Sequence, residues 1–322
     1  MANINDERLQ HAYERVKKMV HYTPFKQSKT LNEHAGCDVH LKLENLQKTG
    51  SFKIRGTFNK ISQLSEEECA HGLVAASAGN HAQGVALAGK QRLIPVTIFM
   101  PIDAPQAKID ATEKYGATVK LAGKDFDAAY KAAQAYEAET GATFIPTFND
   151  MDIIEGHASV AIEMLEQQPD LEVIVVPAGG GGLIAGTALA IKAMNPAVKI
   201  IGVQAENVPS IVRPYYDQAV NYDDFKTTIA EGIAVQTPGE IPLSIIKQHV
   251  DAMITVSEKE IASTILFVLE REKVLIEGAA ASALAAIIYK KLPIKASKIG
   301  VIVSGGNFDI NKLETCIHLS KE

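Results

Sequence analysis

Short apolar runs alternate with longer amphipathic stretches along most of the chain. The apolar runs predict buried strands, which we place at 39–43, 73–76, 96–100, 117–121, 143–146, 172–177, 199–204 and 298–303. Stretches rich in Ala, Glu and Lys lie between them and predict helices at 4–19, 52–64, 80–90, 105–115, 125–139, 153–168, 183–194, 258–272 and 277–290. Short strands separated by helices are typical of an α/β fold with mostly parallel sheets covered by helices. In such sheets ligands bind at the carboxyl ends of the strands.

The length of 322 residues predicts about two domains at roughly 150 residues each. No linker rich in Ser, Gly or Pro divides the chain. We therefore expect strands or helices to cross between the domains, with one domain inserted in the other. The stretch 208–240 has five prolines or glycines and few periodic apolar residues, so we expect a long surface excursion there.

The charge balance excludes some classes of partner. Lys and Arg number 32 against 38 Asp and Glu, a net charge of −6, which disfavours binding to nucleic acid or to an anionic membrane. Cys37, Cys69 and Cys316 are far apart and form no CxxC pair, as expected for reduced thiols. The first residues are charged and lack the apolar core of a signal peptide. We expect a soluble cytoplasmic protein.

The longest uncharged stretch, 173–191, contains a run of four glycines. A membrane span needs about 18 or more apolar residues, but Pro177 and Gly179 to Gly182 interrupt this stretch. It predicts a buried strand, a glycine turn and a helix. Glycines leave backbone N–H groups unshielded, and a helix start adds partial positive charge, so the turn is suited to hold a phosphate.

A dinucleotide site is a second interpretation of the same segment. Gly180-x-Gly182-x-x-Ala185 matches the form G-x-G-x-x-G/A, and Glu206 ends the next strand, where an acid that binds ribose belongs. This short pattern is weak evidence. By itself, the segment leaves an NAD-dependent oxidoreductase open.

Three further segments carry candidate chemistry. Ser51-Phe-Lys-Ile-Arg-Gly56 places a lysine at a predicted helix start, where the helix dipole disfavours a cation and lowers the pKa of the amine. Such an amine is suited to act as a nucleophile or base. Ser77-Ala-Gly-Asn-His-Ala-Gln-Gly84 follows a strand and opens a helix, so its donors suit a carboxylate. Ser304-Gly-Gly-Asn307 ends the last strand.

Together, in this order and spacing, the four motifs resemble those of the fold-type II pyridoxal-phosphate enzymes. Within that group the chain is most similar to the serine/threonine dehydratases, in particular the short, catabolic threonine dehydratases, over residues of about 5 to 315. The resemblance implies a fold like that of the tryptophan synthase β chain and pyridoxal 5'-phosphate as cofactor. It implies α,β-elimination of L-threonine to 2-oxobutanoate and ammonia, and also of L-serine to pyruvate.

The resemblance also implies roles for individual residues. Lys53 would carry the cofactor as a Schiff base and, once freed, remove the α-proton of the substrate. Phe52 would pack near the cofactor ring, and Asn80 would hydrogen-bond the phenolic oxygen of that ring. The cofactor phosphate would be bound by the loop Gly179, Gly180, Gly181, Gly182 and Leu183. The substrate carboxylate would be surrounded by Ser77, Gly79, Asn80 and His81.

Ser304 would face the pyridine nitrogen of the cofactor. A serine hydroxyl is too weak an acid to keep that nitrogen protonated. A neutral pyridine is a poorer electron sink, which favours elimination over transamination. By the same resemblance, both Lys53 and Ser304 take part in catalysis.

Serine racemase is the nearest alternative within the family. Racemisation needs an acid or base on each face of the planar intermediate, and in racemases a second serine supplies one of them. Ala78 stands at that position, so a dehydratase is favoured. Some racemase-like members also bind a divalent cation; Glu206 matches the first ligand, but Val212 stands at the second, and we assign no metal.

The resemblance further implies a large cofactor-binding domain from 1–64 and 151–322 and a small, mobile substrate-binding domain from 65–150. Family members are commonly homodimers or homotetramers, which we expect here. The chain has few residues after Asn307, so we expect no C-terminal regulatory domain. A nucleotide effector at a subunit interface remains open.

Overall fold

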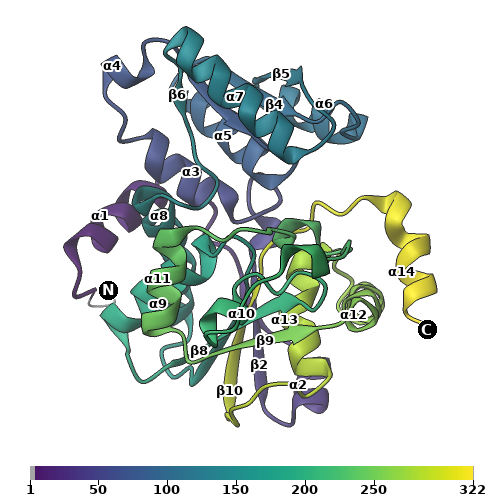
Figure 1. Cartoon of the computed structure of the whole chain (residues 1–322). Coiled ribbons are helices and arrows are strands. Elements are labelled where there is room, and N and C mark those ends of the chain that lie inside the picture. Colours follow the sequence, from purple (N-terminus) through teal and green to yellow (C-terminus); the bar gives the residue numbers. More distant parts are fainter. Residues whose placement is uncertain (1–3, 322) are drawn as a thin grey trace.

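The computed structural model describes residues 4–321 and has two separate sheets (Figure 1). The larger sheet has the strand order β1(Phe25–Gln27), β2(Asp38–Leu43), β10(Lys298–Val303), β7(Val173–Pro177), β8(Lys199–Ala205) and β9(Ala252–Val256). All neighbours in it are parallel except β1 and β2. The expected α/β fold with mostly parallel sheets is confirmed.

Helices cover both faces of the larger sheet. Along β7, Val173 and Val175 pack into one core and Ile174 and Val176 into another, which explains why the strand is apolar at every position. The first core includes residues of α2(Lys29–Ala35), α12(Glu258–Arg271), α13(Gly278–Ile288) and α14(Leu313–Leu319). The second includes residues of α1(Glu7–Val16), α8(Met151–Gln167), α9(Gly182–Met194), α10(Val212–Tyr215) and α11(Glu240–His249).

The smaller sheet is fully parallel, in the order β5(Thr118–Leu121), β4(Val96–Met100), β3(Leu73–Ala76) and β6(Thr143–Phe144). One core on this sheet includes α5(Asn80–Gln91), α6(Gln106–Lys114) and α3(Lys53–Ile61), and another includes α7(Phe126–Thr140). The short α4(Glu66–Cys69) precedes β3. We call residues 66–144 the small lobe, and the remaining described residues the large lobe. In Figure 1 the small lobe lies above the large one.

A strand lies at each of the eight predicted ranges and a helix at each of the nine, although β6 ends two residues early. The pattern missed β1, β9, α2, α4, α10, α11 and α14. The surface excursion expected at 208–240 is wrong in part, because Ile211, Ala230 and Ile233 are buried. Between residues 4 and 321, no helix combines the length and apolarity that a bilayer crossing requires.

The four motifs follow the carboxyl ends of the strands. The glycine run follows β7, Ser304 follows β10, and Lys53 comes after β2. Because β2, β10 and β7 are parallel neighbours, their ends share one edge of the large sheet. Ser77 follows β3 in the small lobe. Both sheets therefore direct their ligand-binding edges toward the space between the lobes.

Candidate active site

A cavity of about 710 Å³ lies between the lobes. Every site residue expected from the sequence lines it: Phe52, Lys53, Ser77, Gly79, Asn80, His81, Gly179, Gly180, Gly181, Gly182, Leu183 and Ser304. The volume is typical of a cofactor or small-molecule site. The fold thus brings the four motifs together around one space.

The glycine run forms the turn between β7 and α9. Gly181 has φ +96°, a left-handed conformation that side chains rarely adopt, and no side chain caps the start of α9. A Cβ at Gly180 would lie 2.2 Å from Cδ1 of Phe148, and one at Gly179 would lie 2.8 Å from Cα of Ile233. The loop therefore has no room for side chains. Its backbone N–H groups and the positive end of α9 suit a phosphate.

Lys53 is the first residue of α3, as predicted. Burial lowers the pKa of its ammonium group to about 8, and the nearby Glu277 carboxylate opposes part of that shift. The pKa of Lys53 is lowered as expected, but the largest cause is burial and not the helix dipole. Nζ lies 3.4 Å from the carbonyl oxygen of Thr147 and 5.3 Å from the centre of the Phe52 ring. At weakly alkaline pH a large share of this amine is uncharged and able to act as a nucleophile.

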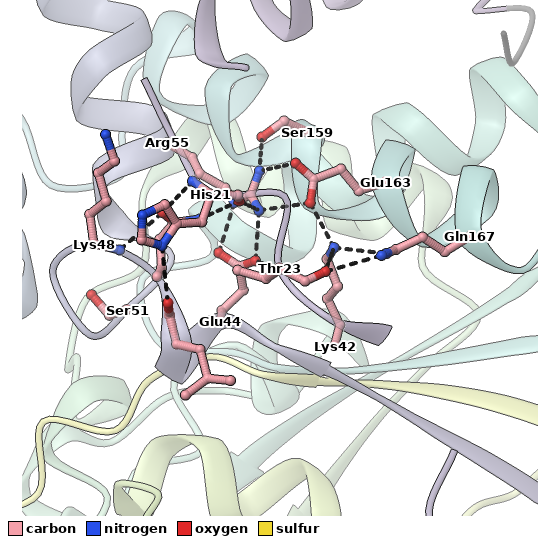
Figure 2. A network of polar contacts seen from close by, with 12 residues as sticks. His21, Thr23, Lys42, Glu44, Lys48, Ser51, Arg55, Ser159, Glu163 and Gln167 are labelled. Carbon is pink, nitrogen blue, oxygen red and sulfur yellow. Dashed lines mark hydrogen bonds and ion pairs between the residues drawn. The ribbon is translucent and has the colours of Figure 1, made fainter. Parts of the chain in front are cut away.

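A buried network of charges anchors the helix that carries Lys53 (Figure 2). The Arg55 guanidinium donates to Glu44 over 2.7 Å from both Nε and Nη2, and to Glu163 over 2.7 Å from Nη1. Lys42 Nζ donates to Glu163 Oε2 over 2.6 Å. All four side chains are at most 1% exposed. Because they come from β2, the turn after β2, α3 and α8, the network fixes α3 to the large lobe.

The network sets the charge state of its members. Burial alone would raise the pKa of the Glu44 carboxyl, but the adjacent Arg55 guanidinium outweighs it and lowers that pKa. Burial works against the charge of Arg55, while Glu44 and Glu163 together raise its pKa. Burial lowers the pKa of Lys42, while Glu163 and Glu44 oppose that shift. The two basic side chains pair with the two acidic ones in a fully buried region.

The loop after β3 brings the small lobe to the cavity. The backbone N–H of Gly79 donates to Oγ of Ser77 over 3.1 Å, and no side chain caps the start of α5. The free N–H groups of the first helical turn suit an anion such as a carboxylate. The His81 ring is buried, with Nε2 3.0 Å from the carbonyl oxygen of Ile145. Burial and the nearby Lys53 lower the pKa of His81 to about 3, so the ring is neutral.

A backbone hydrogen bond joins Phe52 to Ser304. The N–H of Phe52 donates to the carbonyl oxygen of Ser304 over 3.1 Å, which places the lysine segment beside the end of β10. Ser304 is only 2% exposed. The edge of the Phe52 ring packs on His157, with ring centres 4.7 Å apart.

The motifs did not indicate two parts of the cavity wall. Residues 229 and 231–237 line the cavity, although they lie in the stretch expected as surface excursion. Glu277 also lines it and accepts hydrogen bonds from the Asn80 amide. It stands before the run of small residues Gly278–Ala281, which predicts a helix start but carries no signal for a site.

The cavity fits the cofactor that the motifs imply. It combines a glycine cradle without side chains, an amine of lowered pKa and a second uncapped helix start. The glycine cradle suits the phosphate of the cofactor, and the amine suits its aldehyde. The second helix start suits the carboxylate of an amino-acid substrate.

Comparison with known families agrees with this chemistry. Residues 16–305 match the family model described as pyridoxal-phosphate dependent enzyme. The chain is 49% identical to an L-threonine ammonia-lyase of Thermotoga maritima over 97% of its own length and 78% of that protein. It is 40% identical to the catabolic L-threonine dehydratase TdcB of Escherichia coli K12, over 94% of this chain and 92% of that one.

Solved structures show the same similarity. Threonine deaminase isoform 2 from Solanum lycopersicum superposes with a TM-score of 0.91 at 33% identity, covering all of this chain and 92% of that chain. Maize serine racemase also superposes with a TM-score of 0.91 at 33% identity, covering 98% of this chain and 97% of that chain.

Proposed function

Because the chain belongs to the family of pyridoxal-phosphate dependent enzymes, we propose that it is an ammonia-lyase that converts L-threonine to 2-oxobutanoate and ammonia. The observation that carries this proposal is the amine of Lys53, which faces one cavity with the glycine loop and the start of α5. L-Serine, which lacks only one methyl group, is a second expected substrate. The dinucleotide interpretation of Gly180 to Ala185 falls away, since the family match spans that segment.

Each of the expected site residues would have a separate role in the reaction. When bound, pyridoxal 5'-phosphate supplies an electron sink that makes the α-proton of the amino acid acidic. Lys53 Nζ would hold the cofactor and then accept that proton. The β-hydroxyl takes up one proton to leave as water, which balances the α-proton that Lys53 removes. The released enamine then takes up water to give the 2-oxo acid and ammonia. Ser304 would face the ring nitrogen, and the glycine loop would hold the phosphate.

The racemase alternative depends on Ala78. This residue lines the cavity next to Ser77 but has no proton to give. Only Lys53 would then exchange the α-proton, from one face of the substrate. The structural similarity to a serine racemase therefore supports the fold, while Ala78 and the curated relatives favour elimination.

Incubation of the purified holoenzyme with L-threonine, L-serine and D-serine tests the function directly. We expect 2-oxobutanoate from L-threonine, pyruvate from L-serine and almost no product from D-serine, measured as coloured hydrazones. The chirality of the serine left over is followed by chromatography. Substantial D-serine formed from L-serine would overturn the argument from Ala78, and no 2-oxo acid from any substrate would overturn the lyase assignment.

Substitution of a single loop glycine should release the cofactor. In Gly180→Ala the new methyl group would lie 2.2 Å from the Phe148 ring, so the loop has to move. We expect the dissociation constant for pyridoxal 5'-phosphate to rise by about 10-fold or more, since each lost charge-assisted hydrogen bond is worth roughly that much. Absorbance titration of the apoenzyme measures it.

Gly182→Ala is the graded control for that prediction. Its Cβ would lie 3.1 Å from Cβ of Phe148, a contact that a small shift relieves. The dissociation constant should therefore rise less than in Gly180→Ala. An equal effect of the two variants would contradict the steric explanation.

We further propose that the small lobe, which corresponds to the mobile domain expected at 65–150, closes on the large one when the substrate carboxylate binds at the start of α5. Two contacts between the lobes, the first of them inside the cavity, support this movement. Lys108 Nζ of the small lobe lies 3.0 Å from Glu231 Oε2 of the large lobe, and Tyr115 donates to the Lys48 carbonyl oxygen over 3.0 Å. We also propose a cytoplasmic location, in keeping with the unpaired cysteines and the charged first residues. A homodimer or homotetramer and a nucleotide effector rest on the resemblance alone; sedimentation with and without nucleotides tests both.

A further inference from the structure

Glu277 places a carboxylate in the cavity beside Asn80, a residue expected to contact the cofactor. It immediately precedes α13, and its backbone N–H donates to the Gly305 carbonyl oxygen over 3.1 Å. Both of its carboxylate oxygens accept from Nδ2 of Asn80, over 2.9 and 3.0 Å. Asn80 belongs to the small lobe and Glu277 to the large lobe, so the contact joins the lobes inside the cavity.

The carboxylate of Glu277 occupies a slot formed by glycines. A Cβ at Gly305 would lie 2.5 Å from its Oε1, and one at Gly232 would lie 3.3 Å from the same atom. Any side chain at Gly305 would displace the carboxylate. The absence of side chains at Gly305 and Gly232 therefore leaves space for the Glu277 carboxylate, and the backbone of these two glycines restricts its orientation.

Two partners together fix the orientation of the Asn80 amide. Asn307 Nδ2 donates to Oδ1 of Asn80 over 2.7 Å and to the Thr49 carbonyl oxygen over 2.8 Å. An ionised carboxylate only accepts, so Glu277 requires the nitrogen of the amide on its side. If one hydrogen of Nδ2 is shared between the two carboxylate oxygens, the second remains free to donate. If the Asn80 amide were flipped, its oxygen would face the Glu277 carboxylate and its nitrogen would face the Asn307 amide nitrogen, and neither hydrogen bond would form.

We propose that Glu277 is a positioning residue, which holds the Asn80 amide with its free N–H group available to the cofactor ring when the lobes are together. This inference rests on the proposed function, because it concerns the side chain expected to contact the phenolic oxygen. Glu277 acts through Asn80 and needs no contact with the substrate. It also makes the orientation of Asn80 depend on lobe closure.

The charges around Glu277 are consistent with this role. Lys53 and Lys108 are the positive groups that act on it, and Glu231 is the negative one. Burial raises the pKa of Glu277, while the Asn80 amide and the Lys53 ammonium oppose that rise. The carboxylate thus relies on these two neighbours to remain an acceptor.

Four variants test the proposal: Glu277→Leu, Glu277→Gln, Asn80→Ala and the double variant of Asn80→Ala with Glu277→Leu. We measure the dissociation constant of pyridoxal 5'-phosphate, the visible absorption band of the resting enzyme and kcat/KM for L-threonine. Glu277→Leu should shift the absorption band and lower kcat/KM. It should also raise the dissociation constant of pyridoxal 5'-phosphate by about 10- to 100-fold. Glu277→Gln keeps an amide oxygen that accepts from Asn80, so it should recover most of the loss.

The double variant decides whether Glu277 acts through Asn80. If it does, adding Glu277→Leu to Asn80→Ala produces no further loss. Glu260→Gln, which weakens an ion pair with Lys291 outside the cavity and does not touch Asn80, should leave the band unchanged. Additive losses, or a wild-type band and affinity in Glu277→Leu, would overturn the positioning role. A wild-type enzyme that binds no pyridoxal 5'-phosphate would overturn the proposed function instead.

Discussion

Lys53→Ala is expected to lose the visible absorption of the covalently held cofactor and to reduce kcat for L-threonine by roughly 10³-fold or more. The loss follows from the proposed function, in which one amine would serve both as the attachment point and as the base, and general-base catalysis by itself contributes about 10²- to 10⁴-fold. The structure supports the choice of Lys53, because burial lowers its pKa to about 8 within the cavity. Absorption spectra and initial rates measure both effects.

A second lysine on the same helix is the control for that loss. Lys60 also lies on α3, but its Nζ pairs with Asp150 and Asp152 over 2.9 and 3.0 Å, and it does not line the cavity. Lys60→Ala should retain the absorption band. A band of wild-type intensity in Lys53→Ala would show that another amine holds the cofactor.

Glu163→Gln is expected to destabilise the protein by about 3–5 kcal/mol, the typical loss when one partner of a buried ion pair is removed. The substitution leaves Arg55 and Lys42, both fully buried, with only the Glu44 carboxylate between them. The midpoint of urea unfolding of the apoenzyme gives the change in free energy of unfolding. Because α3 carries both Arg55 and Lys53, activity should also decline at temperatures below the unfolding transition.

Glu166→Gln on the same helix is the matched control. Glu166 is exposed and accepts from the Tyr13 hydroxyl over 2.6 Å. Its loss should change the free energy of unfolding by at most about 1 kcal/mol, as for exposed polar contacts. Equal destabilisation by the two variants would contradict the importance of burial for the network in Figure 2.

The central strands were predictable because they are buried on both faces. β7 is apolar at every position, and β8 and β10 are apolar at most positions, which is a strong local signal. The signal was weaker at β1, which has only three residues and lies at the sheet edge, partly exposed. It was also weaker at β9, the other edge, where Ile254 and Thr255 are only partly buried. Edge strands bury less surface, so their pattern is less distinct.

The candidate site was predictable where chemistry requires a rare local pattern. Four consecutive glycines and a lysine after Thr-Gly-Ser are uncommon enough to be noticed in a single sequence. Glu277 was not found, since its role depends on Asn80, which lies far away in the chain and in the other lobe. The buried pairing of Lys42 with Glu163 was hidden for the same reason. Contacts between distant segments leave no periodic trace in the sequence.

The order of the large sheet also determines when the protein is able to complete its fold. β10, near the end of the chain, lies between β2 and β7, so two early strands cannot join until the last one has been synthesised. The small lobe, by contrast, is built from one continuous segment and closes its sheet by itself. During translation, a nascent chain would therefore leave the backbone groups on one edge of β2 and one edge of β7 unpaired until residue 303 has left the ribosome. The cavity between the lobes forms in the same final step, so no partial chain of this kind holds a finished site.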